Sequence, residues 1–184
     1  TVTQTVQTLQ PEKFLAVKSV SPSGKVGVGF PMKLNLSRNV KGKAARERVE
    51  KRLTVKANGE TIEGGAWRWD SGTELQYRPP EFWPGNSTIT LNADFRGPKV
   101  TKNVWGESDE LRKWNTGPAM ISYVDLQSHQ MKVTRDGKTI RTIPITGGKS
   151  GFDTRSGVKV VLTKELDRQM DAATGGTEAS DPEY

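Results

Sequence analysis

Residues 53–62 read LTVKANGETI and place Asn58-Gly59 between two short apolar runs. Asn-Gly is a favoured pair for a two-residue hairpin turn, because both central positions of that turn need positive φ angles. The flanking runs have the length and composition of strands, so the stretch predicts an antiparallel β-hairpin. The 19 glycines, the 10 prolines and the lack of a long helical periodicity point the same way. The predicted fold class is all-β.

Upstream of this hairpin, Met32, Leu34 and Leu36 alternate with polar residues, which is the period of a strand with one buried face. Short strands with frequent turns between them indicate an immunoglobulin-like β-sandwich. The cysteine pair of antibody domains is missing, so we expect aromatic side chains to supply the core volume of the disulfide. The same reasoning predicts further strands at residues 14–20, 26–28, 67–69, 74–78 and 87–95.

Trp67 and Trp69 stand two residues apart, so both side chains face the same side of a strand. Such a pair fits either the buried face of a sandwich or an exposed platform for stacking a sugar ring. The alternation of apolar residues around the pair favours the core.

A second domain is predicted after the turn-prone residues 115–118, which read NTGP. Asp136-Gly137 is a second hairpin signal there, and Val158, Val160 and Leu162 alternate as a strand after a glycine-rich loop. The predicted organisation is a flexible leader over residues 1–12, an immunoglobulin-like domain over 13–116 and part of a second, β-rich domain over 117–184. The strands expected to open this second domain are residues 120–126, 130–134 and 139–145.

The positive charge is confined to the first part of the chain. Residues 1–115 hold 19 Lys and Arg against 12 acids, an excess of 7, whereas residues 116–184 hold 9 of each. Ala45, Val49 and Leu53 recur every four residues within the most basic stretch, which predicts a short amphipathic helix over residues 44–53. The basic side chains of this stretch are Lys41, Lys43, Arg46, Arg48, Lys51, Arg52 and Lys56.

A basic patch of this kind attracts polyanions, and anionic cell-wall polymer is one candidate. A merely solvated helix face is the simpler interpretation. Nucleic acid is not predicted as a partner, because the aromatic residues lie away from the basic stretch instead of interleaving with it.

Several kinds of site are excluded by residue type. The chain has no cysteine, so it can supply neither a thiolate nucleophile nor a thiolate metal site, and no metal or cofactor is predicted. His129 is the only histidine, and Ser128 beside it cannot form a catalytic pair by adjacency. Gly148-Lys149-Ser150 lacks the upstream glycine and the following helix of a phosphate-binding loop.

A set of short strings carries a family resemblance that covers residues 14–174. Together they resemble the immunoglobulin-like domain, and then the start of the catalytic β domain, of actinobacterial L,D-transpeptidases. The strings are VGVGFP at 26–31, GAWRWDS at 65–71, YRPPEFW at 77–83, DGK at 136–138, PITGGK at 144–149, FDTRSG at 152–157 and MDAAT at 170–174.

This resemblance implies acyl transfer between peptidoglycan stem peptides outside the cytoplasm, at the cell wall or the outer face of the membrane. A cysteine attacks the donor peptide, a histidine acts as base and backbone amides stabilise the oxyanion. The family carries this chemistry on a Ser-His-Gly-Cys motif and a preceding histidine, which we expect downstream of Tyr184.

The chain alone is therefore expected to be inactive. A non-catalytic wall-binding or spacer module is the alternative function. Met170 is the one position that the resemblance marks as a substrate contact, and an apolar packing role is equally compatible with it. The incomplete second domain is also expected to leave strand edges and apolar faces that a strand exchange or a dimer could cover.

Overall fold

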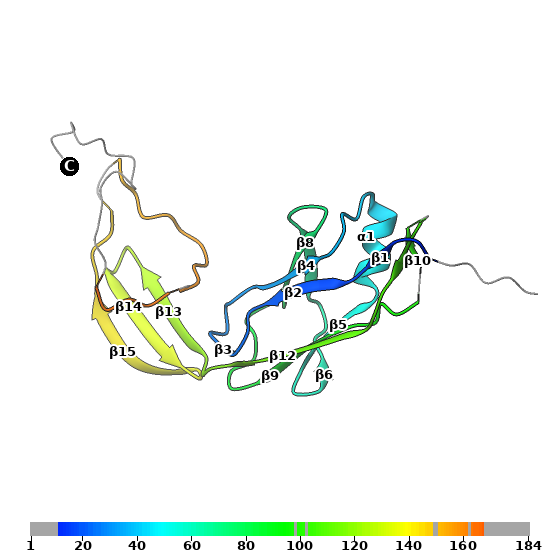
Figure 1. Ribbon diagram of the computed structural model, residues 1–184. Helices are drawn as coiled ribbons and strands as arrows, with labels where there is room; N and C mark the ends of the chain where they lie inside the picture. Colours follow the sequence, from blue (N-terminus) through cyan, green and yellow to red (C-terminus); the bar gives the residue numbers. More distant parts are fainter. Residues whose placement is uncertain (1–10, 98, 102, 149–150, 162, 168–184) are drawn as a thin grey trace, which may run out of the picture.

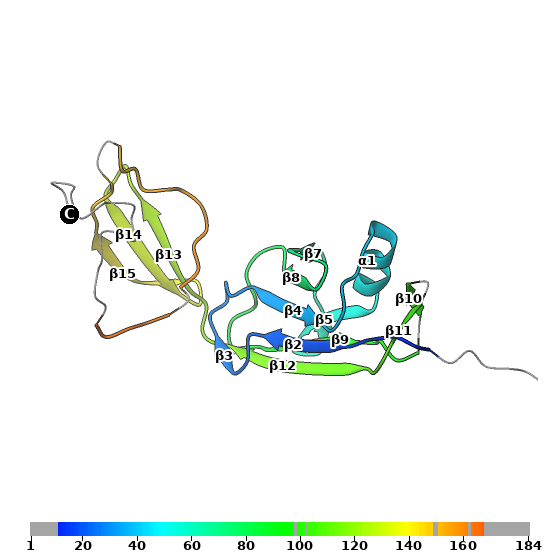
Figure 2. The ribbon, with the colours of Figure 1, turned by 45° about the horizontal axis from the view of Figure 1, so that its top comes forward.

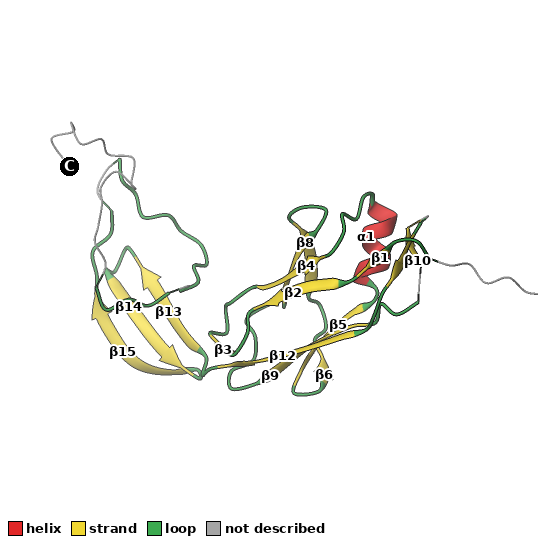
Figure 3. Cartoon of the chain, viewed as in Figure 1, coloured by secondary structure: helices red, strands yellow, loops and turns green. Residues whose placement is uncertain are grey.

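The computed structural model describes residues 11–97, 99–101, 103–148, 151–161 and 163–167. Strands dominate this part of the chain, and its one helix lies beside the sandwich, far from the last three strands (Figures 1 and 3). The all-β prediction is confirmed.

Two antiparallel sheets face each other and form the predicted immunoglobulin-like sandwich; Figure 2 shows β2 and β4 lying over β9 and β12. One sheet has the order β2-β4-β8-β7, and the other has the order β3-β12-β9-β5-β6, in which only β3 pairs in parallel. The first sheet contains β2 (Val17–Ser21), β4 (Met32–Leu36), β8 (Glu74–Arg78) and β7 (Ala66–Trp69). The second contains β3 (Lys25–Val26), β12 (Glu110–Thr116), β9 (Thr88–Ala93), β5 (Leu53–Ala57) and β6 (Glu60–Thr61).

The predicted strand over residues 14–20 is divided between two sheets. Its first part, β1 (Phe14–Leu15), pairs in parallel with β11 (Val104–Gly106), which in turn pairs with β10 (Lys99–Thr101). The chain then passes through Ala16 into β2, and the Ala16 amide donates to the Ser37 hydroxyl at 2.9 Å. The residues on both sides of the switch, Phe14 to Val17, form one continuous apolar run, so the sequence pattern alone could not reveal it.

Both predicted hairpin turns are present. Asn58 and Gly59 have φ angles of 50° and 92° between β5 and β6, and Asp136 and Gly137 have φ angles of 48° and 80°. The second turn joins β14 (Gln130–Arg135) to β15 (Lys138–Pro144). Positive φ at both central positions is the property for which Asn-Gly and Asp-Gly are favoured.

The predicted amphipathic helix is α1 (Lys43–Glu50), and its buried residues are Ala45 and Val49. It ends earlier than predicted, because Leu53 is the first residue of β5 and pairs with β9. Leu53 is buried all the same. The four-residue spacing therefore identified three core residues but extended the helix too far.

Four aromatic rings form a continuous column that crosses the sandwich core. Trp67 of β7 contacts Tyr77 of β8 with ring centroids 5.0 Å apart, Tyr77 contacts Trp83 at 5.8 Å, and Trp83 meets Trp114 of β12 edge-on at 5.8 Å. The Trp83 indole also donates to the Phe30 carbonyl at 2.6 Å. The column joins the two sheets, as expected of a sandwich that has no disulfide.

A separate three-stranded meander follows the sandwich and stands beyond its end (Figure 1). It consists of β13 (Met120–Asp125), β14 and β15, paired in chain order. β12 runs as far as Thr116 through the predicted break at Asn115-Thr116, because both residues pair with β3. The predicted domain limits stay a prediction.

The strand predicted at Val158, Val160 and Leu162 is wrong over its described residues. Residues 158–161 belong to no strand, and Val158 and Val161 are 76% and 72% exposed. Leu162 lies outside the described residues. The alternation of valines indicates extended backbone, but a strand also needs a neighbour to supply its hydrogen bonds.

We predict that Gly65→Ala destabilises the sandwich by about 1–3 kcal/mol, the usual range for an overpacked core. A methyl group at this position would overlap the hydroxyl and ring of Tyr77, which the neighbouring rings of the column hold in place. Gly27→Ala is the matched control, since no described residue comes within 4 Å of a methyl group there. Urea unfolding followed by tryptophan fluorescence measures both, and equal midpoints for the two variants would contradict the prediction.

Candidate functional site

The arginines of the basic stretch are bound to the protein's own backbone. Arg46 Nε donates to the Val40 carbonyl at 3.3 Å, and Arg48 Nε donates to the Val100 carbonyl of β10 at 2.8 Å. Arg52 Nη1 donates to the Asp94 carbonyl at 3.4 Å. These bonds attach α1 and the residue pair after it to neighbouring segments, so much of the arginine charge has a structural role.

The lysines of the same stretch lie at the surface. Lys41, Lys43 and Lys51 are exposed, and among the described residues only Lys43 of the three has an acidic partner, Glu47, at 4.0 Å. Lys56 is half-buried in β5, on the sheet rather than the helix. The predicted patch therefore consists of arginines that donate to backbone carbonyls, three exposed lysines, and Lys56, which lies apart from the other lysines in β5.

A hollow of about 500 Å³ opens between α1 and β7, and no pattern in the sequence predicted it. The Arg46 guanidinium lies 4.9 Å from the centre of the Trp69 ring, and the Trp69 indole donates to Glu50 at 2.6 Å. Arg46 and Glu50 are four residues apart on one helix face, which lets both reach the same ring. Gly42, Lys43 and Glu47 complete the lining, so acids accompany the bases here.

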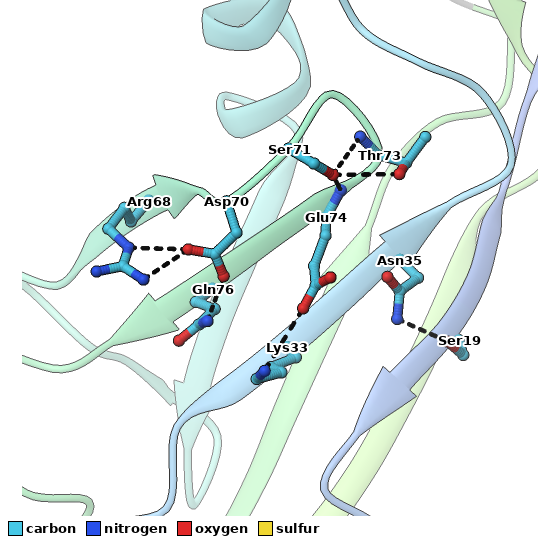
Figure 4. A network of polar contacts seen from close by, with 9 residues as sticks. All are labelled: Ser19, Lys33, Asn35, Arg68, Asp70, Ser71, Thr73, Glu74 and Gln76. Carbon is cyan, nitrogen blue, oxygen red and sulfur yellow. Dashed lines mark hydrogen bonds and ion pairs between the residues drawn. The ribbon is translucent and has the colours of Figure 1, made fainter. Parts of the chain in front are cut away.

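A network of polar side chains covers the outer face of β7, β8 and β4 (Figure 4). Arg68 donates to Asp70 through Nε at 3.0 Å and Nη2 at 2.6 Å, and Gln76 donates to the other oxygen of the same carboxylate. Lys33 pairs with Glu74 at 3.5 Å. The hydrogen bonds from Arg68 lower the pKa of Asp70 below its ordinary value of 3.8. The network holds no nucleophile next to a base, so it has the chemistry of a stabilised surface.

Ser128 and His129 lie in the turn between β13 and β14. The Ser128 hydroxyl donates to Asp125 Oδ2 at 2.7 Å, which lowers the pKa of Asp125, and the backbone amide of Gln127 donates to the same carboxylate. His129 is exposed and has a φ of 54°. Because the serine proton points to the carboxylate and not to the imidazole, this turn is not a nucleophile with its base.

One face of the meander carries a row of three apolar residues that the described residues cover only in part. Val124, Met131 and Ile143 stand opposite one another across β13, β14 and β15, so they form one row on the sheet. Val124 is 53% exposed, and Met131 and Ile143 are half-buried. On the opposite face Lys132 lies over the Tyr123 ring at 5.7 Å. This row is a candidate for the uncovered apolar surface that we expect of an incomplete second domain.

Met170, the predicted substrate contact, lies outside the described residues. Within the described ranges, no group of three or more His, Asp or Glu side chains is arranged to hold a metal ion. The single helix of that part of the chain is too short to cross a membrane.

A family model described as a bacterial Ig domain matches residues 1–99, which is more than half of the chain. L,D-transpeptidase 2 of Mycobacterium tuberculosis is 25% identical over 157 residues, which cover 85% of this chain and 37% of that protein. L,D-transpeptidase 5 of the same species is 27% identical over 156 residues, which cover 82% of this chain and 34% of that protein. The chain thus spans about a third of the length of these two relatives.

A solved L,D-transpeptidase from Mycobacterium smegmatis has 29% sequence identity and a TM-score of 0.67, and the match covers 92% of this chain and 70% of that one. These alignments are too long to lie within residues 1–99 alone, so the similarity to L,D-transpeptidases extends past the family match and into the meander.

We predict that Arg68→Met raises the pKa of Asp70 towards 3.8, since the largest cause of its lowering is removed. A lowered carboxyl pKa stabilises the fold above the ordinary pKa, and this contribution disappears as the pH falls through the folded-state value. Carboxyl-carbon NMR titration measures the midpoint. Asp125 is the internal control, because its lowering comes from Ser128 and Gln127. An unchanged Asp70 midpoint would refute the assignment of the effect to Arg68.

Proposed function

We propose that this chain, which belongs to the bacterial Ig domain family, is the N-terminal portion of an L,D-transpeptidase that cross-links peptidoglycan stem peptides by cysteine acyl transfer. One observation carries the proposal. The similarity to L,D-transpeptidases covers 92% of the chain in a solved structure, whereas the Ig family match ends at residue 99. The second part of the chain, and not only its common sandwich, therefore has its counterpart in these enzymes.

Acyl transfer needs a nucleophile that this chain does not contain. It has no cysteine, so the thiolate and its histidine base come from residues downstream of Tyr184 in this proposal. Met170 contributes a contact to the donor peptide. The action is extracytoplasmic, because the peptidoglycan substrate lies there. The chain by itself is inactive.

The apolar row Val124, Met131 and Ile143 supports a catalytic domain that is completed by residues downstream of Tyr184. A sheet with an apolar face needs a second layer to bury it, and within a catalytic domain the following chain supplies that layer. The chain covers 70% of the length of the solved relative from Mycobacterium smegmatis, which leaves room for such a layer in a protein of that size. The meander is then the first half of a catalytic core.

Covalent labelling tests the proposal. A relative, L,D-transpeptidase 3 of Mycobacterium tuberculosis, has been solved with a faropenem-derived adduct, so faropenem is a suitable probe. We predict that the 184-residue chain gains no stable mass on incubation with faropenem, whereas the polypeptide extended by its natural reading frame past Tyr184 gains one adduct. A cysteine-to-serine variant of the extended protein is the control. A frame that ends at Tyr184, or that encodes no cysteine, would refute the proposal.

The exposure of Lys41, Lys43 and Lys51 favours a second candidate, a non-catalytic module that holds anionic wall polymer. Lys41→Glu with Lys51→Glu is expected to reduce retention on purified cell walls at least several-fold, and to weaken its dependence on salt. The matched control is Lys113→Glu with Lys138→Glu, two exposed lysines elsewhere that give the same change in net charge. A pull-down measures the bound fraction, and equal retention of both variants would exclude this candidate.

A further inference from the structure

The connection between the sandwich and the meander is held by backbone hydrogen bonds. It consists of Gly117, Pro118 and Ala119, between the end of β12 and the start of β13. The Gly117 amide donates to the Val26 carbonyl at 2.8 Å, and its carbonyl accepts from the Asn86 amide at 2.8 Å. A flexible linker leaves such groups to water.

The remaining groups of the connection are also satisfied within the protein. The Pro118 carbonyl accepts from the Met120 amide at 2.8 Å. The Ala119 amide donates to Asp136 Oδ1 at 2.8 Å, and the Ala119 carbonyl accepts from the Asp136 amide at 3.0 Å. Proline has no amide hydrogen, so every backbone donor and acceptor of the three residues has a partner. Such complete pairing holds the connection in one conformation.

Gly85 of the sandwich lies directly against this connection. A Cβ at Gly85 would lie 2.9 Å from the Ala119 nitrogen, 3.2 Å from Asp136 Oδ1 and 3.3 Å from the Ala119 Cβ. The Asp136-Gly137 turn of the meander is therefore seated on the loop that carries Gly85. Ala119 and Ile121 also pack against the core of the sandwich, which adds an apolar contact to the polar ones.

A second contact joins the two parts at another loop. A Cβ at Gly29 would lie 3.4 Å from Val160 Cγ2 and 3.7 Å from the Phe82 ring. In Figure 1 the orange segment after β15 returns to this end of the sandwich, near β3. Trp83 holds the loop that carries Gly29 through two hydrogen bonds. Its backbone amide donates to the Val28 carbonyl at 2.8 Å, and its indole donates to the Phe30 carbonyl. The second part of the chain therefore meets the sandwich at two separate loops, those of Gly85 and Gly29.

We propose that the sandwich end made by residues 26–31 and 80–86 is a docking platform that holds the second part of the chain in one orientation, with Asp136 as a positioning residue. The immunoglobulin-like part is then a rigid arm and not a loose spacer. That the arm carries a transpeptidase domain rests on the proposed function; the docking itself does not. A rigid arm would hold that domain at one angle to the peptidoglycan.

Cysteine pairing in the 184-residue chain tests the second contact, and this chain has no native cysteine that could react with the two introduced thiols. The first pair is Gly29→Cys with Val160→Cys, because a Cβ at position 29 would lie 3.4 Å from Val160 Cγ2, an atom that a cysteine sulfur at position 160 can replace. The control is Gly27→Cys with Val160→Cys, since no atom of the described residues, Val160 included, lies within 4 Å of a Cβ at Gly27. We expect the first pair to oxidise at least about tenfold faster than the control by intact mass after alkylation. Equal rates would overturn the platform, because a loosely tethered part would bring both pairs together alike.

Residual dipolar couplings test the orientation on the protein including its natural reading frame past Tyr184. We expect amides of β9 and β12 and amides of β14 and β15 to fit one alignment tensor. Asp136→Gly keeps a residue that hairpin turns favour but removes the carboxylate, so we expect the two parts to need two alignment tensors. Asp136→Asn keeps an acceptor oxygen, so we expect both parts to fit a single tensor. Two tensors in the unchanged protein would refute the rigid arm. Neither readout needs catalysis, so faropenem labelling can fail while the platform stands.

Discussion

The contact on which the sandwich depends is the aromatic column from Trp67 through Tyr77 and Trp83 to Trp114. Trp67 and Tyr77 belong to one sheet and Trp114 to the other, so the column spans the core. Tyr77, Trp83 and Trp114 are at most 4% exposed. Burial of large rings supplies the cohesion that antibody domains reinforce with an inter-sheet disulfide, and it does so in a chain without cysteine.

The same column also holds in place a loop at the end of the sandwich that faces the meander. Trp83 packs into the core with its ring and holds the loop of Val28 and Phe30 with its two N–H groups. Phe82, its neighbour in the chain, is left 39% exposed at the contact with Gly29. Core packing and the attachment of the second part are thus linked through adjacent residues, and a change that loosens the column would also loosen the attachment.

The sequence located the candidate site residues better than it described their roles. The density of Lys and Arg over residues 41–56 was evident, but nothing in the spacing revealed that Arg46, Arg48 and Arg52 donate to backbone carbonyls. Those carbonyls belong to residues up to 52 positions away in the chain. Likewise, Trp69 was expected in the core, and it does pack against the core while its indole N–H binds Glu50 of the helix.

The sequence by itself determined the all-β class, the two hairpins and the buried alternation of β4, because turn chemistry and period-two burial are local properties of the chain. Only the tertiary structure decided that the first strand divides between two sheets at Ala16 and that residues 158–161 belong to no strand. It alone decided that Gly117, Pro118 and Ala119 form a bonded junction instead of a turn-rich linker. Each of these outcomes depends on which distant backbone supplies the hydrogen-bond partner, and that information is absent from any short window of sequence.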